Sequence, residues 1–270
     1  MPADAAAPLS LIKAHAYGND FLLAVAAETA GDSDPAELAR RVCDRHHGIG
    51  ADGLLFCHPS PAGARMVLRN ADGSPSELSG NGVRCVGAWL AHTRSLPDGV
   101  HLTIETDAGA KALTLLHREA FRFTFRAAMG RPEAVKEVRL EVAGESVTAV
   151  TMRVGNPQCV VIGPATEARL HSVASALAVH PHFPAGTNVE LAEVLSRDRI
   201  RILIWERGVG PTSSSGTGTC AAAVAASAYG GASKALEVVA PGGSQTVEWT
   251  DDGLWLTGWA ELVGRIDWWR

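Results

Sequence analysis

The stretch ELSGNGVRCVGAWLA, residues 77–91, returns in altered form as SSSGTGTCAAAVAAS, residues 213–227. Each copy places a Ser-Gly-X-Gly turn directly before a run of small and apolar residues, which predicts helices over Gly80–Thr93 and Gly216–Tyr229. Both runs are too uniformly apolar to lie on a surface. Because the copies stand about half a chain apart, the repeat predicts two pseudo-symmetric halves, each a sheet wrapped around one central helix.

The rest of the chain is dominated by short β-type runs such as ARMVLRN, HLTIET and RILIWER, separated by Gly, Pro and Asp. The segment TVEWTDDGLWLTG predicts a hairpin around 251–253. Asp34 and Pro35 are typical of a capped helix start, and a further helix is predicted over Thr166–Leu177. Helices do not alternate with single strands, so we expect an α+β fold with mostly antiparallel sheets rather than a parallel βαβ sheet.

The domain boundaries expected from this pattern are residues 1–120 for the N-terminal half and 121–261 for the C-terminal half. Whether the last residues, 262–270, return to the first half is left open.

Composition excludes several classes of function. The 270 residues are 46% hydrophobic and 20% charged, with a formal net charge of −5 and no run of basic residues, so binding to nucleic acid is not expected. No signal for secretion or for a membrane span is present, which makes a cytoplasmic location the expectation. The 5 cysteines contain no CxxC pair, and the histidine pairs lack partners at ligand spacing, so neither a disulfide framework nor a metal site is expected.

The two Ser-Gly-X-Gly turns are candidate anion sites. A helix N-terminus presents unpaired N–H groups and partial positive charge, and glycine lets a carboxylate approach closely. Ser79 and Ser215 are predicted N-caps, a role that alone explains either one. Two such turns facing one cleft would instead flank the α-carbon of a shared carboxylate, an arrangement suited to proton removal on one side and delivery on the other.

Other polar residues stand at the ends of predicted strands. Each is typical of a turn by itself. Together they can line a pocket for a zwitterionic amino acid, in which the arginine would bind a carboxylate through two hydrogen bonds. The set comprises Asn19, Asn70, Asn156, Asn188, Glu206 and Arg207.

Cofactor motifs are weak or absent. SGTGTCA loosely matches a dinucleotide fingerprint but lacks a surrounding βαβ unit, and no P-loop, HExxH or GxSxG occurs. Few lysines are available for a Schiff base. The sequence therefore predicts chemistry without a cofactor.

Several segments, in order, resemble the diaminopimelate epimerase family: KAHAYGNDF, CDRHHGIGADGLL, NADGSPSELSGNGVRC, VGNPQCV, HPHFPAGTNVE and WERGVGPTSSSGTGTCAAA. The resemblance covers almost the whole chain. It implies two α+β domains that close over the substrate and a cofactor-independent epimerisation of L,L- to meso-diaminopimelate in lysine and peptidoglycan precursor synthesis. It also implies a two-base mechanism with one cysteine on each side of the α-carbon, and a homodimer.

The matching motifs also imply residue roles. Asn70, Asn156, Asn188 and Arg207 would hold the distal end of the substrate, with Asn19 and Glu206 assisting. The reacting carboxylate would lie against Gly80, Asn81, Gly216 and Thr217.

The chain departs from the family at three positions. Ser79 and Ser215 stand where the family has its catalytic cysteines, and Gln158 stands where it has a histidine. A hydroxyl is a weaker acid than a thiol by roughly five pKa units, so forming the base costs about 7 kcal/mol more. Cys85 and Cys220 lie roughly 9 and 7.5 Å further along the predicted helices and do not replace the serines. The catalytic set is thus expected to be Ser79, Ser215, Glu206 and Gln158.

Three alternatives stay open at this point. The same serines could serve a dehydratase or another isomerase of this fold, or the pocket could belong to an amino-acid-binding pseudoenzyme. An engineered replacement of two cysteines would explain the serines but gives no reason for Gln158, so a natural variant is favoured.

Overall fold

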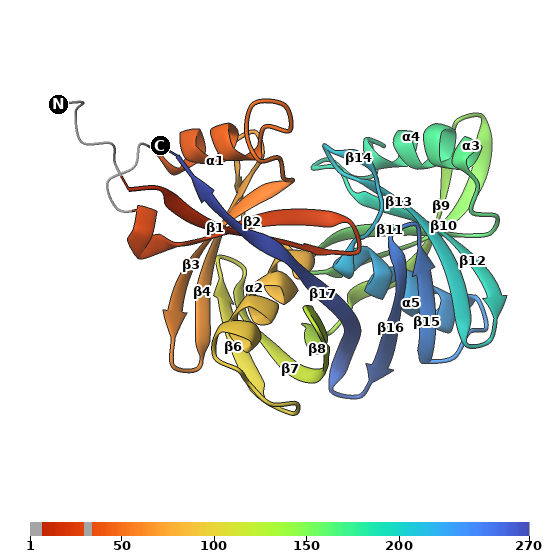
Figure 1. Ribbon diagram of the computed structural model, residues 1–270. Helices are drawn as coiled ribbons and strands as arrows, with labels where there is room; N and C mark the ends of the chain where they lie inside the picture. The colour runs from red at the N-terminus through yellow and green to blue at the C-terminus, as the bar shows by residue number, and fades with distance from the viewer. Residues whose placement is uncertain (1–6, 30–33, 270) are drawn as a thin grey trace. The chain divides into compact units, whose positions relative to one another are not determined.

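The computed structural model describes residues 7–29 and 34–269 and consists mostly of strands (Figure 1). The chain divides into two compact units. Unit 1 comprises Met1–Arg126 with Trp259–Arg270, and unit 2 comprises Ala127–Gly258. Strand β8 (Arg122–Gly130) and strand β17 (Gly253–Trp268) each contribute residues to both units.

In unit 1 the strands are paired mainly antiparallel, with parallel pairs β2–β3 and β4–β6. Helix α2 contacts β1, β2, β4, β6 and β7, so strands cover it on several sides, while α1 packs on β3 and β4. The elements are β1 (Leu9–Ala16), β2 (Asn19–Val25), the 3-10 helix η1 (Ala26–Thr29), α1 (Pro35–Cys43), β3 (Gly53–Ser60), β4 (Gly63–Asn70), β5 (Pro75–Ser76), α2 (Gly80–Thr93), β6 (His101–Thr106) and β7 (Gly109–Glu119).

Unit 2 is built in the same manner. Its parallel pairs are β11–β12 and β13–β15, its other pairs are antiparallel, and α5 contacts β10, β11, β12, β13, β15 and β16. The elements are β9 (Glu133–Val142), β10 (Glu145–Val154), β11 (Asn156–Ile162), α3 (Glu167–Arg169), the π-helix η2 (Leu170–Ala174), α4 (Ser175–Ala178), β12 (Asn188–Ser196), β13 (Arg199–Glu206), β14 (Gly210–Thr212), α5 (Gly216–Tyr229), β15 (Ala235–Ala240) and β16 (Gly243–Thr250).

The two central helices have the predicted bounds, and their apolar sequences are buried inside their own units. Ser79 caps α2 by accepting a hydrogen bond from Gly82 N at 3.0 Å, and Ser215 caps α5 by accepting from Gly218 N at 3.3 Å. These caps satisfy one N–H of each helix start. The mostly antiparallel α+β prediction is confirmed for each unit, while the homology of the two halves stays a prediction.

The hairpin predicted at 251–253 is confirmed, since β16 and β17 pair with Thr250 opposite Gly253. Asp34 caps α1 as expected, accepting from Ala36 N at 3.1 Å. The helix predicted over Thr166–Leu177 is confirmed in its extent, with Thr166 as N-cap. Its geometry is not regular: α3, η2 and α4 follow one another without a break, with a π turn between two short α segments. The hydroxyls of Ser172 and Ser175 donate to carbonyls four residues earlier, a pattern that bends helices.

Within the described ranges 7–29 and 34–269, none of the helices has the length and apolar character needed to cross a bilayer.

Candidate functional site

In unit 2 the start of α5 lies against three strands that carry polar side chains. Gln158 on β11 is opposite Asn188 on β12, and Glu190 on β12 is opposite Ile204 on β13. Because side chains alternate along a strand, Asn188 and Glu190 share one face of the sheet. Glu206, two residues beyond Ile204, points to that same face.

The amide of Gln158 joins this strand cluster to the helix start. In one orientation its nitrogen donates to Asn156 Oδ1 at 2.5 Å. In the other, Nε2 donates to Glu190 Oε1 at 3.1 Å and Oε2 at 3.3 Å, while Oε1 accepts from the Thr217 hydroxyl at 3.1 Å. We assign the second orientation because in the first the amide oxygen would face the acceptor oxygens of Glu190 and the amide nitrogen would face the Thr217 hydroxyl.

Glu190 is enclosed by protein, with 0% of its surface exposed. Burial raises the pKa of its carboxyl well above the ordinary value, and the charge of Glu206 raises it further. A Cβ on Gly218 would lie 2.3 Å from Glu190 Oε1 and 3.2 Å from Ser215 Oγ. The glycine therefore makes room for this carboxyl beside the first turn of α5.

The turn after β13 is fixed by Asn188, whose Oδ1 accepts from the backbone N of Arg207 at 2.9 Å. The guanidinium of Arg207 donates from Nη1 to the carbonyl of Ala185 at 2.7 Å and is exposed to solvent. The structure thus brings two predicted binding residues, Asn188 and Arg207, into direct contact.

In unit 1 the start of α2 is held by a line of amides. Asn81 is buried and donates from Nδ2 to Asn19 Oδ1 at 3.1 Å, while its own Oδ1 accepts from Arg84 Nη2 at 2.5 Å. Arg84 is 1% exposed and stacks over the ring of Tyr17. Two predicted binding residues, Asn19 and Asn81, are therefore neighbours, next to the cap residue Ser79.

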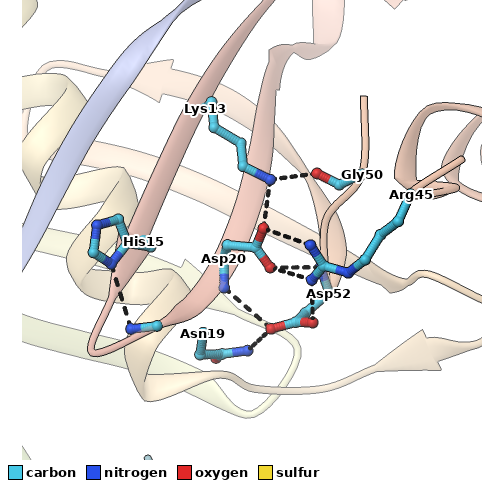
Figure 2. A network of polar contacts seen from close by, with 8 residues as sticks. Lys13, His15, Asn19, Asp20, Arg45, Gly50 and Asp52 are labelled. Carbon is cyan, nitrogen blue, oxygen red and sulfur yellow. Dashed lines mark hydrogen bonds and ion pairs between the residues drawn. The ribbon is translucent and has the colours of Figure 1, made fainter. Parts of the chain in front are cut away.

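Figure 2 shows how Asn19 is anchored on its other side. Its Nδ2 donates to Asp52 Oδ2 at 2.7 Å, and Asp52 also pairs with Arg45 at 2.9 Å. Arg45 bridges to Asp20 at 2.7 Å, which pairs with Lys13 at 2.5 Å. Burial opposes ionisation of Asp20, but hydrogen bonds from Arg45 and Lys13 outweigh it and lower the pKa of that carboxyl.

Within the described part of the chain, Asn70 forms no side-chain hydrogen bond with the other predicted residues. It lies at the end of β4 and donates from Nδ2 to Ser74 Oγ at 2.9 Å, within the turn that leads to β5. Its predicted contact with substrate stays a prediction.

The cysteines are poorly placed to ionise. All are free thiols with buried side chains. Burial raises the pKa of Cys85 to about 12, and burial likewise raises the pKa of Cys159. Among the residues that the structure describes, no group of three or more His, Cys, Asp or Glu is arranged to hold a metal ion.

Sequence reasoning did not single out Glu190, Asp52 or Arg45. Glu190 had a signal, because it is a charged residue inside the buried run NVELA, where strands are normally apolar. Asp52 and Arg45 stand in CDRHHGIGADGLL, but nothing in the spacing connects them with Asn19, which is brought to them by the parallel pairing of β2 with β3.

Several solved protein structures share the fold of this chain. A probable proline racemase from Agrobacterium radiobacter K84 superposes with a TM-score of 0.70 at 19% identity, covering 96% of this chain and 92% of that one. A phenazine biosynthesis protein of the PhzF family from Bacillus anthracis gives 0.71 at 16% identity, covering 96% and 98%. A predicted epimerase from Pseudomonas aeruginosa gives 0.72 at 16% identity, covering 96% and 98%. The fold is therefore that of the racemase, epimerase and PhzF class.

Sequence similarity narrows the class to one family. Residues 11–135 and 150–263 match the family described as Diaminopimelate epimerase. The diaminopimelate epimerase of Desulforudis audaxviator is 42% identical, covering 97% of this chain and 100% of the relative, and that of Moorella thermoacetica is 37% identical, covering 96% and 99%. The chain belongs to the diaminopimelate epimerase family.

Proposed function

We propose that this protein is an isomerase that epimerises L,L-diaminopimelate to meso-diaminopimelate, without a cofactor, in lysine and peptidoglycan precursor synthesis. The observation that carries the proposal is the 42% identity to a diaminopimelate epimerase along nearly the full length of both chains. No comparison favours a dehydratase or a pseudoenzyme.

In this proposal the two helix starts bind the reacting carboxylate. Backbone N–H groups at Gly80, Asn81, Gly216 and Thr217 carry the partial positive charge of their helices, which stabilises an anion and the charge that develops on the neighbouring carbon. Asn70, Asn156, Asn188 and Arg207 bind the distal amino-acid end, assisted by Asn19 and Glu206. Arg207 suits a carboxylate because its fork can donate two parallel hydrogen bonds.

Ser79 and Ser215 are the proposed proton-transferring groups. Epimerisation requires one of them to reach each face of the same α-carbon, since the proton leaves on one side and arrives on the other. Each hydroxyl oxygen accepts a backbone N–H of its own helix, which favours negative charge on that oxygen. This contribution offsets part of the roughly 7 kcal/mol by which a hydroxyl is the harder group to ionise.

Incubation of the purified protein with L,L-diaminopimelate in deuterated water tests the activity. We expect meso product, separated by chiral chromatography, with deuterium at the inverted α-carbon seen by mass spectrometry. Ser215→Ala is the matched control, because it keeps the fold and removes one proposed base. Binding without exchange would sink the proposal in favour of a binding protein, and loss of water or ammonia would replace it with a lyase.

The double change Ser79→Cys with Ser215→Cys tests the chemistry of the bases. A thiolate forms more readily than an alkoxide, so kcat should rise at least about tenfold. Unchanged binding with no rise in kcat would show that Gln158 or the pocket geometry, rather than the hydroxyls, limits the reaction.

The cytoplasmic location and the homodimer expected from the resemblance are part of the same proposal. Sedimentation velocity of the purified protein checks the homodimer, and a sedimentation coefficient of a single chain at micromolar concentration rejects it.

A further inference from the structure

The buried carboxyl of Glu190 lies outside the proposed set of substrate-binding and proton-transferring residues. It lies on β12 with 0% of its surface exposed, among residues that are mostly apolar. Enclosing a carboxyl costs free energy that an apolar residue of similar size would not cost. A carboxyl buried in this way beside the start of α5 therefore points to a chemical role for Glu190.

Two observations place this carboxyl near Ser215. An ideal Cβ built on Gly218 would lie 2.3 Å from Glu190 Oε1 and 3.2 Å from Ser215 Oγ. The distance between these two oxygens therefore cannot exceed the sum of those two distances. Gln158 also holds the carboxyl through its amide nitrogen, at 3.1 and 3.3 Å. Gln158 and the first turn of α5 therefore hold the carboxyl close to the hydroxyl of Ser215.

Resting on the proposed function, we propose that Glu190 is a positioning residue that exchanges a proton with the hydroxyl of Ser215 during the reaction. No histidine is present in the Gly-Asn-Pro-Gln motif to exchange this proton, and Gln158 has no titratable proton. In this assignment Gln158 orients the carboxyl of Glu190, and that carboxyl exchanges the proton.

The step is balanced in both directions. When Ser215 removes the α-proton, the Cα–H bond breaks, a new O–H bond forms on Oγ, and the original hydroxyl proton passes to the Glu190 carboxylate. The electron pair of the broken bond stays on the substrate carbon. In the return direction Ser215 gives its proton to that carbon, and the neutral carboxyl of Glu190 replaces it.

Both protonation states of Glu190 must be accessible near neutral pH for this exchange. Burial and the charge of Glu206 on β13 raise the pKa of the Glu190 carboxyl, which makes its carboxylate a stronger proton acceptor toward the hydroxyl. On β11 the thiol of Cys159 lies on the opposite face of the sheet, and burial and the charge of Glu190 raise its pKa. The start of α5 contributes its helix dipole.

A thiol placed at position 215 provides a test that needs no turnover. We would compare the Ser215→Cys protein with and without Glu190→Gln, and follow thiolate absorbance against pH as a difference from the parent protein. Removing the neighbouring carboxylate should lower the pH midpoint of the new thiol by about one unit. The same pair in a Ser79→Cys background is the control, with no midpoint shift expected.

Kinetics give the second test. Glu190→Gln should lower kcat about 100-fold while KM changes little, and should remove the ionisation of Glu190 from the pH profile of kcat/KM. Glu190→Asp, which keeps the carboxyl, should restore part of kcat and the profile. If Glu190→Gln does not fold, as judged by circular dichroism, the Glu190→Asp profile and the Ser215→Cys midpoints with Glu190→Asp decide the question.

The outcomes separate this inference from the proposed function. An inactive parent protein with a shifted Cys midpoint overturns the epimerase activity and retains the coupling of Glu190 to position 215. An active parent protein whose Glu190→Gln variant keeps both kcat and the pH profile, with an unmoved midpoint, overturns the role of Glu190. Equal midpoint shifts in the Ser215→Cys and Ser79→Cys proteins would also overturn it, since they would indicate a general disturbance.

Discussion

Gly218→Ala is the most informative single change in the α5 start. Its new Cβ would lie 2.3 Å from Oε1 of Glu190, too close for a real contact, and 3.0 Å from Cδ, which is tight, so the buried glutamate would have to move. Overpacking of this kind costs typically about 1–3 kcal/mol. Alanine returns up to about 1 kcal/mol in helix propensity, so the expected net loss is about 1–2 kcal/mol.

Gly82→Ala is the matched control at the third position of α2. There the nearest atoms to an added Cβ are Ser79 Cβ at 3.3 Å and Leu55 Cδ2 at 3.4 Å, which is tight but close to ordinary contact. The helix propensity gain should therefore balance or exceed any crowding, and stability should stay within about 0.5 kcal/mol of the parent.

Thermal unfolding followed by circular dichroism measures both variants. Gly218→Ala should melt about 2–8 °C lower than the parent, because 1 kcal/mol corresponds to about 2–4 °C in a chain of this size. It should also lose turnover, since Glu190 and Ser215 both border the new methyl group. The reasoning is refuted if Gly218→Ala melts together with Gly82→Ala and keeps the parent kcat.

Three further predictions concern single side chains. Ser79→Ala should cost about 1 kcal/mol through loss of the α2 cap, with Ser79→Asp close to the parent, as measured by chemical denaturation. Asp20→Asn should destabilise the protein more at pH 7 than at pH 3. Arg45 and Lys13 lower the pKa of Asp20 in the folded protein, so its contribution to stability is present above the unfolded pKa and is lost as pH falls through the folded pKa. Equal losses of stability at both pH values would contradict this prediction. Glu190→Gln should gain stability relative to the parent as pH rises above about 4.3. The raised pKa of Glu190 in the folded parent gives stability that is present below the unfolded pKa and is lost as pH rises through the folded pKa. A difference in denaturation midpoint that does not change with pH would rule this out.

Local pattern was sufficient for several features of this protein. The bounds of α2 and α5, their serine caps and the hairpin between β16 and β17 depend on neighbours a few residues apart in the chain. Local pattern also predicted the helix over Thr166–Leu177, but it did not predict the π turn inside it, where serine hydroxyls compete for backbone carbonyls.

The candidate site was predicted in part. The repeat of Ser79 and Ser215 and the family motifs gave the candidate residues, and the structure pairs Asn19 with Asn81 and Asn188 with Arg207. The motifs did not reveal which polar groups support these residues.

The sequence by itself determined which segments become buried helices, which serines cap them and which family the chain resembles, because these properties are carried by residue type and short spacing. Only the tertiary structure decided that Glu190 lies against Gly218, and that Asp52 anchors Asn19. Those contacts depend on the register between strands and on the packing of a helix over them. A one-residue change of register would turn each side chain to the opposite face of its sheet, and the register is fixed only when strands distant in the chain pair and bury one face together.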